Sequence, residues 1–427
     1  MKLNKIALYL LNLIYSSLMI FYNVLPSFIV VIMSFVLFMY NYFKLSREYN
    51  KTIAIFIDGL LFLPVSFVSI LATPYSTLPL TWFSISLIIL TIIIILKKKL
   101  KRLYLLLYFL FLSIFLITIF FSNTLVSAVS QFFTITLCLI SLQIGEYLKS
   151  NYSEKLLYLV QNCYILTTIA FAFQIIIQRF WILKTGHVIG HYAIMGGNRY
   201  AYSGLMGDYS FASLYLVTGA MLILLLYIRG KKRSFLEFFL IFSFVVFASI
   251  LVSARTGIFS LAITIVLYFL FNFKKNSAKI FLLVILGMIA LPFIFNFMTS
   301  IRIMDNLLDG SGRVELISKA WNIFLQHPVL GIGFGIDNLK YNYNLVVPHN
   351  FFVQYLLQFG IVGFGLLLSN FIVFYQKYKR NNYLMWLFVL CFIGAMLIPD
   401  IVSSRFLSTI MIMVIINSEE GGTYEKK

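Results

Sequence analysis

Residues 103–121, LYLLLYFLFLSIFLITIFF, contain no charged side chain, and runs of this kind decide the class of fold. A helix of roughly 20 apolar residues is long enough to cross a hydrocarbon core of about 30 Å. Such runs recur from one end of the chain to the other, and 61% of its 427 residues are hydrophobic while 11% are charged. Because lipid offers the backbone no hydrogen-bond partner, each run must be a helix, and the alternation typical of strands is absent. The sequence therefore predicts an all-α polytopic integral membrane protein.

We expect about fourteen transmembrane helices (twelve to fourteen) in a single transmembrane domain that covers residues 1–427. The expected spans are residues 6–22, 27–43, 53–72, 78–96, 103–121, 125–144, 156–178, 209–228, 235–252, 257–273, 280–298, 351–375, 383–399 and 401–416. No small-residue cleavage site follows the first run, so we interpret it as a retained helix rather than a signal peptide.

The formal net charge of +19 comes mostly from short loops between the apolar runs. With both termini in the cytoplasm, 24 of the 33 Lys and Arg residues lie inside and 9 lie outside. The positive-inside rule favours this orientation, with the inner loops next to an anionic leaflet. A basic face on a folded domain is missing, which argues against a nucleic-acid partner.

Two loops are long in this topology, residues 179–208 and 299–350, and both are predicted to be external. They contain all four histidines, His187, His191, His327 and His349. His187 and His191 have the spacing of metal ligands on a helix, but glycines interrupt the segment, so we predict no metal site. The three cysteines lie inside apolar runs and indicate neither a disulfide framework nor a metal cluster.

The second external loop carries a predicted amphipathic helix over residues 313–326, which Pro328 would stop. Its apolar residues have helical spacing and would lie on the membrane surface; they are Leu316, Ile317, Ala320, Trp321, Phe324 and Leu325. Arg313 either binds a lipid pyrophosphate through its planar guanidinium group or snorkels to the interface. Gly331, Gly333 and Gly335 follow no strand, so they indicate a bend rather than a dinucleotide site.

Two further positions carry candidate chemistry. His349 precedes a helix, where the positive end of the helix dipole favours the neutral imidazole that a general base requires. Its alternative role is an interfacial hydrogen bond to a loop carbonyl. Arg255 lies at the external end of a span, where a charge is expensive and indicates function unless it snorkels to the headgroups. We expect Asp58 to be a structural partner, and Asp400 to form an ion pair with Arg405.

Several of these residues recur in a known pattern. Residues 190–370 resemble the O-antigen ligase/polymerase superfamily in four blocks: His349-Asn350 with Gly360 and Gly363; Arg313, Trp321 and His327-Pro328 with Gly331 and Gly333; Ser253-Ala254-Arg255-Thr256-Gly257; and Arg199, Gly204 and Asp208.

The resemblance implies a glycosyltransferase at the outer face of the bacterial cytoplasmic (inner) membrane. It would move a glycan from undecaprenyl pyrophosphate to an acceptor hydroxyl without a metal or other cofactor. Arg199 and Arg255 would neutralise the leaving pyrophosphate, and His349 would position or deprotonate the hydroxyl. Arg313, Asn350, Trp321 and His327 would bind substrate. The implied partners are the lipid-linked oligosaccharide and membrane lipids, while a chain-length regulator is left open.

Three functions remain to be compared. A polymerase of lipid-linked repeat units is favoured, and a ligase that uses a different acceptor shares its motifs. A lipid-linked glycan flippase or other transporter is disfavoured, because polar residues gather in two outer loops rather than through the midplane of two repeated halves.

Overall fold

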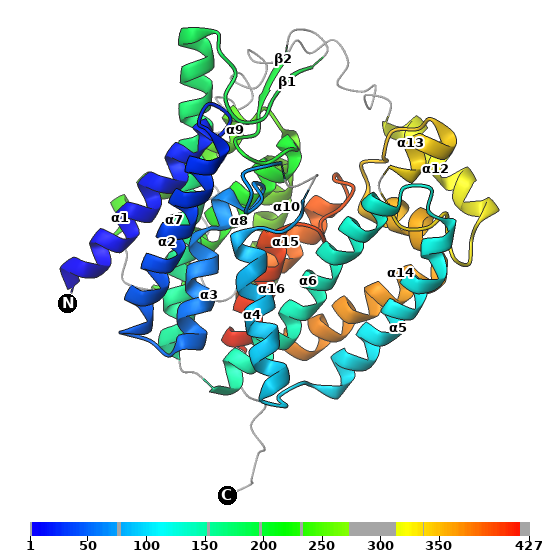
Figure 1. Cartoon of the computed structure of the whole chain (residues 1–427), viewed down its shortest axis with the longest axis horizontal. Coiled ribbons are helices and arrows are strands. Elements are labelled where there is room, and N and C mark those ends of the chain that lie inside the picture. The colour runs from blue at the N-terminus through cyan, green and yellow to red at the C-terminus, as the bar shows by residue number, and fades with distance from the viewer. Residues whose placement is uncertain are drawn as a thin grey trace, which may run out of the picture.

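The computed structural model describes residues 2–74, 78–151, 154–195, 199–230, 234–272, 313–335 and 337–418. Its helices are α1 (Lys2–Leu18), α2 (Ser27–Ser46), α3 (Lys51–Leu61), α4 (Trp82–Leu96), α5 (Arg102–Thr118), α6 (Leu125–Asn151), α7 (Glu154–Thr185), α8 (Tyr209–Ile228), α9 (Phe235–Leu251), α10 (Arg255–Asn272), α12 (Arg313–Gln326), α13 (Asn338–Tyr343), α14 (Phe351–Tyr378), α15 (Met385–Ala395) and α16 (Arg405–Asn417) (Figure 1). Short 3₁₀ turns η1 (Met19–Phe21), η2 (Leu63–Val65) and η3 (Ile119–Phe121) follow α1, α3 and α5.

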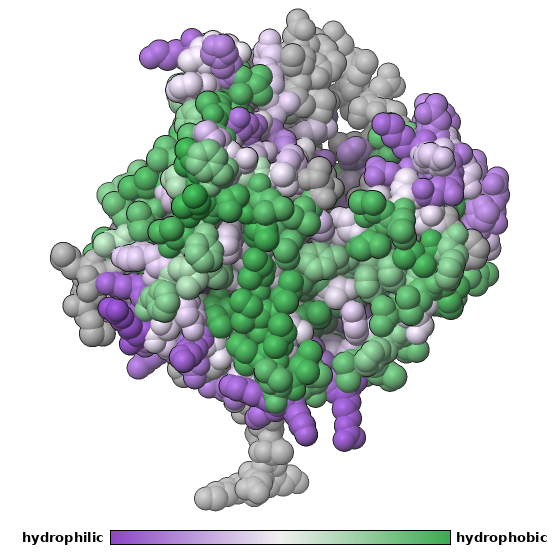
Figure 2. Space-filling model, viewed as in Figure 1, coloured by the Kyte–Doolittle hydropathy of each residue, from purple (hydrophilic) through white to green (hydrophobic). Residues whose placement is uncertain are grey.

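The helices form a bundle with an apolar middle. In the part of the chain described, α2, α6, α7, α8, α10 and α14 are long and apolar enough to cross a membrane, and shorter apolar helices accompany them. Figure 2 shows a hydrophobic surface across the middle of the bundle and hydrophilic surface at its two ends. α8 is the most enclosed candidate span, with 89% of its apolar window buried. The chain is thus a helical membrane protein, as its sequence predicts.

Helices occur in every expected span except residues 280–298, which lie outside the described residues. The expected span at residues 53–72 is only partly helical. α3 ends at Leu61, and the chain continues through a 3₁₀ turn that contains Pro64. Proline has no backbone N–H to donate, so the α-helical ladder cannot continue through it.

Among the described residues, one β-hairpin departs from the predicted all-α fold. Strands β1 (Tyr192–Met195) and β2 (Arg199–Tyr202) pair antiparallel, with Tyr192 opposite Tyr202 and Met195 opposite Arg199. Each strand has four residues. Such short strands produce too little alternation to be recognised beside long apolar runs.

The two ends of the bundle differ in chemistry. At one end, the basic loops meet aromatic and acidic groups: Lys97 donates to Tyr147 over 2.9 Å, Lys377 pairs with Glu146, and the Arg229 guanidinium lies 4.2 Å from the centre of the Tyr383 ring. The β1–β2 hairpin, α12 and α13 lie at the other end (Figure 1). The described parts of the two long loops therefore share one end of the bundle, opposite the basic loops.

Candidate functional site

The site begins at the N-terminus of α14, where His349 and Asn350 precede the helix. The Asn350 side chain accepts a hydrogen bond from the Val353 amide over 3.1 Å, so it caps the helix. Its amide nitrogen also donates to the Met396 carbonyl at the end of α15, over 3.3 Å. His349 itself is half-buried. The cap holds its backbone beside α15, at the positive end of the α14 dipole.

α14 is not the continuous span that the sequence predicts, because it breaks at Gly360. This residue has φ 63° and ψ −173°, a backbone conformation that residues other than glycine rarely adopt. Residues 351–359, which we call the half-helix, are too few to cross a membrane. The half-helix therefore carries His349 at one end and meets the Gly360 break at the other.

The loop at residues 328–333 fills the break. Its groups take over the backbone hydrogen bonds that the break frees: Ile332 N to Leu357 O (2.9 Å), Gly333 N to Gln358 O (3.0 Å), Ile361 N to Pro328 O (2.8 Å) and Val362 N to Val329 O (3.3 Å). Gly331, Gly333 and Gly335 all have positive φ, which confirms the predicted bend. A Cβ on Gly331 would lie 2.4 Å from the Gln358 carbonyl oxygen. The glycines let the loop approach the open helix closely enough to pair with it.

A buried polar network supports the half-helix from beneath. The Tyr355 hydroxyl donates to Asp400, which also accepts from the Ser403 amide over 3.0 Å. The Ser403 hydroxyl joins Asp400 to Thr134 of α6, 2.8 Å away. Burial raises the pKa of Asp400, while hydrogen bonds from Ser403 and Tyr355 and the charge of Arg405 act to lower it. The carboxyl group ties the half-helix to α6 and to the α15–α16 turn.

A second contact lies one turn further along the half-helix. Gln358 and Gln131 of α6 are both buried, and their side-chain amides are hydrogen-bonded over 2.9 Å. The Gln131 oxygen also accepts from the Gly335 amide over 2.8 Å. α6 thus fixes both the half-helix and the loop that fills its break.

Asp400→Leu is expected to destabilise the protein by about 2–4 kcal/mol, because it leaves the Tyr355 and Ser403 hydroxyls buried without this acceptor. Asp400→Asn is expected to cost about 1 kcal/mol, since the amide oxygen accepts from Tyr355 and its NH₂ donates to Ser403. Thermal unfolding in detergent measures both. Equal losses for Asn and Leu would contradict this assignment.

Arg255 is the first residue of α10 and is half-buried. The turn before it is compact: Ser253 has φ 65°, and the Ala254 carbonyl accepts from Ser213 of α8 over 3.4 Å. A Cβ on Gly257 would lie 2.2 Å from the Ser213 hydroxyl oxygen. The Ser-Ala-Arg-Thr-Gly block therefore packs α10 closely against α8 and fixes the position of Arg255 at the start of α10.

Contacts through α15 relate Arg255 to His349. Leu214 of α8, next to the serine that holds the Arg255 turn, packs against Gly394 of α15. Two residues later, the Met396 carbonyl accepts from Asn350. Arg255 therefore starts a helix that packs on α8, and α8 in turn contacts the end of α15 to which Asn350 is hydrogen-bonded.

Trp321 lies on α12, which packs on the half-helix. The buried face of α12 is Ala320, Ile323 and Phe324, in a cluster with Ile332, Leu339 and Leu357. Other residues of the expected apolar face are not covered by protein, since Trp321 is 43% exposed and Leu325 is 58% exposed. Packing on a protein surface needs only the narrow face that meets the partner helix. Arg313 begins α12, and its side chain lies outside the described residues.

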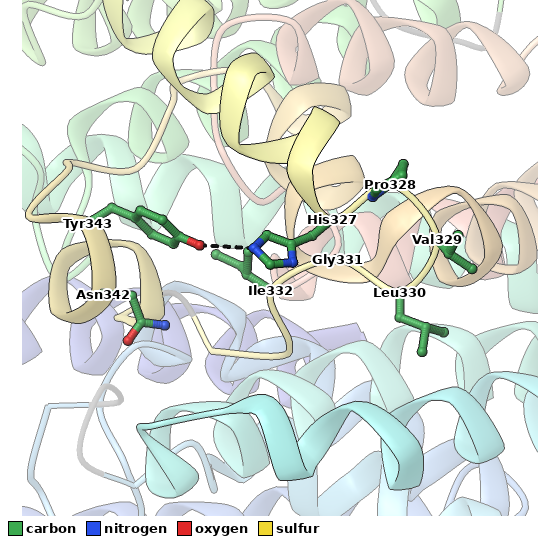
Figure 3. A pocket seen from close by; sticks show the side chains of 8 residues that line it. All are labelled: His327, Pro328, Val329, Leu330, Gly331, Ile332, Asn342 and Tyr343. Atoms are coloured by element: carbon green, nitrogen blue, oxygen red, sulfur yellow. Dashed lines mark hydrogen bonds between the residues drawn. The ribbon is translucent and has the colours of Figure 1, made fainter.

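His327 follows α12 and lines an open cleft of about 460 Å³ (Figure 3). Its Nε2 atom lies 3.3 Å from the hydroxyl of Tyr343, at the end of α13. The loop that fills the Gly360 break forms part of the wall of the cleft, and Asn342 and Tyr343 of α13 form another part. His327 thus lies near the far end of the half-helix from His349.

Arg199 begins β2, and its side chain lies outside the described residues. Gln178 of α7 fixes the hairpin by donating to the His191 carbonyl (2.7 Å) and accepting from the Gly204 amide (2.9 Å). Asp208 caps α8 by accepting from the Ser210 and Phe211 amides over 2.6 and 3.2 Å. The Arg199, Gly204 and Asp208 block is therefore built around a turn and a helix cap.

The other titratable residues considered from the sequence are two histidines, Arg405 and Asp58. Burial lowers the pKa of His191, while His187 is exposed. Arg405 donates to the carbonyls of Ser403 (2.7 Å) and Pro79 (3.3 Å) rather than serving Asp400 alone. Asp58 is fully buried in α3. Within the described residues, no three His, Cys, Asp or Glu side chains are grouped to hold a metal ion.

The structure brings His349 and Asn350 together with the α15–α16 turn, and it places Trp321 and His327 on the segment packed against the half-helix. Its described contacts do not join Arg199 or Arg313 to this group. Tyr355, Gln131 and Gln358 were not among the residues predicted from the sequence. Tyr355 and Gln358 are polar side chains three residues apart inside an apolar run, and that spacing was a usable signal.

One comparison with known proteins finds a family. Residues 240–368 match the family model described as O-Antigen ligase. This match confirms the resemblance to the O-antigen ligase/polymerase superfamily, and it contains Arg255, Arg313, His349 and Gly360. No curated protein and no solved structure matches the chain.

Proposed function

We propose that this member of the O-antigen ligase/polymerase superfamily is a polysaccharide polymerase of the bacterial cytoplasmic membrane. It transfers a growing glycan from undecaprenyl pyrophosphate to the non-reducing end of a lipid-linked repeat unit. The observation that carries the proposal is the broken helix α14, which presents His349 at the end of the bundle opposite the basic loops. If both termini are cytoplasmic, as the basic loops favour, that end faces outward.

The reaction forms one bond and breaks one. The acceptor hydroxyl oxygen attacks the anomeric carbon of the donor sugar, and the bond from that carbon to the pyrophosphate oxygen breaks. His349 takes the hydroxyl proton or orients the hydroxyl for attack. Negative charge develops on the leaving pyrophosphate, so a cation near it lowers the barrier. Arg255, Arg199 and Arg313 are the proposed cations, because a guanidinium group pairs with two phosphate oxygens at once.

The surroundings of Arg255 and His349 support these roles. Arg255 is the first residue of α10, His349 lies two residues before α14, and both side chains are half-buried rather than fully solvated. A partly dry setting strengthens the attraction between a guanidinium group and a phosphate. Trp321 is exposed on α12, where its ring is accessible to a sugar or to lipid.

Arg255→Ala is expected to lower the rate of transfer by about 10²- to 10³-fold, the usual effect of removing one charge-stabilising donor. Arg255→Lys should recover only part of this loss, because lysine cannot form the bidentate pair. Initial rates with purified protein measure both. Arg380→Ala is the matched control, since Arg380 is an exposed arginine at the opposite end of the bundle. Wild-type rates for Arg255→Ala would remove Arg255 from the site.

A ligase is the second candidate, because the matching family model is described as O-Antigen ligase. The test is to supply purified protein with a single lipid-pyrophosphate-linked repeat unit in the presence of a chelator. A ladder of repeat-unit multiples identifies a metal-independent polymerase. Transfer only to a separately added acceptor identifies a ligase, and no transfer to any acceptor would remove both.

A further inference from the structure

The cleft beside His327 has the chemistry of a carbohydrate site. Its described lining is His327, Pro328, Val329, Leu330, Gly331, Ile332, Asn342 and Tyr343. Three of these side chains have polar groups that hydrogen-bond to hydroxyls, and the Tyr343 hydroxyl faces the His327 imidazole (Figure 3). The other five lining residues, 328–332, are apolar or glycine. A sugar ring needs both features, because its hydroxyls are polar and its C–H faces pack on apolar or aromatic groups.

The charge of the cleft separates it from a pyrophosphate site. None of its described lining residues carries a formal positive charge, apart from the titratable imidazole of His327. Binding a pyrophosphate would require guanidinium or ammonium groups. The lining therefore fits a neutral ligand better than the anionic group of the donor.

The position of the cleft separates it from a lipid-chain site. Asp337, Lys340 and Tyr341 of the neighbouring α13 segment are exposed, and Figure 2 shows hydrophilic surface at this end of the bundle. A prenyl chain gains free energy by staying in the apolar belt, and it would lose this on entering a polar surface. The exposed polar groups of α13 beside the cleft therefore favour a polar ligand over a prenyl chain.

The walls of the cleft are held rigidly. The His327 carbonyl accepts from the Gly331 amide over 3.0 Å, and Leu339 of α13 is buried with Phe324 of α12. Asn342 accepts from Asn123, which fixes α13 to the start of α6. A preformed cleft loses little conformational entropy when a ligand binds.

The cleft is also close to His349 along the chain. Tyr343 and His349 are six positions apart in the chain, and a fully extended chain covers at most about 20 Å in six positions. A glycan whose end reacts at His349 can therefore reach the cleft with sugars further along the same chain.

We propose that this cleft is a saccharide subsite that holds neutral sugars of the glycan some distance from the reacting bond. The inference rests on the proposed polymerase function and adds a role to it. By holding the product between transfers, the cleft raises the number of repeat units added before the glycan is released. His327, Asn342 and Tyr343 are its contact residues.

The first test measures binding apart from catalysis. Free repeat-unit oligosaccharide, without its lipid and pyrophosphate, is titrated calorimetrically into the detergent-solubilised full-length protein. Tyr343→Ala is expected to weaken binding about tenfold. Tyr343→Phe keeps the ring and loses the hydroxyl, so it should have a smaller effect. Tyr341→Ala is the matched control, because Tyr341 is 71% exposed on the same helix and is not part of the cleft.

The second test measures product length. Tyr343→Ala and Asn342→Ala are expected to form the first dimer of repeat units within about twofold of the wild-type rate, but to give a ladder shortened severalfold. Full-length ladders and unchanged oligosaccharide binding in both variants would overturn the subsite. Displacement of the oligosaccharide by undecaprenyl phosphate would overturn it in favour of a lipid site. If the wild-type protein binds oligosaccharide but forms no dimer, the polymerase function fails while the saccharide site stands.

Discussion

His349→Ala is expected to reduce glycan transfer by about 10²- to 10⁴-fold, the range that a positioned general base contributes. The fold should be kept, because the Asn350 side chain rather than His349 caps α14. The measurement is the rate of repeat-unit dimer formation by purified protein, with thermal unfolding as the check on folding.

His349→Gln distinguishes two roles for the imidazole. Glutamine can hydrogen-bond to the acceptor hydroxyl but cannot accept its proton at neutral pH. A rate close to that of His349→Ala indicates a base, and a rate close to wild type indicates positioning. His187→Ala is the matched control, since His187 is an exposed histidine in the other long loop. Wild-type polymer from His349→Ala would place the reaction elsewhere.

The helical spans were predictable because each depends on a local property, the length of an apolar run. The break in α14 was not predictable in the same way. Residues 351–375 have the hydropathy of one continuous span, and the break depends on a loop more than twenty residues earlier in the chain. The glycines at 331, 333 and 335 indicated a bend, but only the fold shows that the bend pairs with residues 357–362.

The candidate site residues also divide into those recognisable from local sequence and those that depend on contacts between distant parts of the chain. His349 and Asn350 were recognisable because they are adjacent in the chain and precede a helix. The Tyr355–Asp400 contact joins residues 45 positions apart, so no local pattern contains it. The exposure of Trp321 also depends on which face of α12 meets the half-helix, and apolar spacing alone does not distinguish two neighbouring apolar stripes.

Gly360→Ala is expected to be the most damaging substitution of a small residue in this segment. The added Cβ would lie 2.2 Å from the Val329 carbonyl oxygen and 2.3 Å from its carbonyl carbon, at a backbone φ of 63°. Those neighbours are backbone atoms, so they cannot rotate away as a flexible side chain would. Strain at positive φ and overpacking together predict a loss of about 2–5 kcal/mol in the free energy of unfolding.

Gly365→Ala provides the matched control within the same helix. No atom lies within 4 Å of a Cβ at that position, and Gly365 has ordinary helical geometry. Alanine is favoured over glycine inside a helix, so this variant should be unchanged or about 0.5–1 kcal/mol more stable. Thermal unfolding in detergent compares the two variants directly.

Gly360→Ala is also expected to lower the rate of glycan transfer. The Gly360 break sets the direction of the half-helix, and the half-helix sets the position of His349. At a temperature where Gly360→Ala remains folded, its transfer rate should still fall by about 10²-fold, because small displacements of a catalytic group are costly. A folded Gly360→Ala variant with the wild-type rate would show that the break is only structural. A rate that falls only in this variant, and not in Gly365→Ala, would tie the position of His349 to the loop that fills the break.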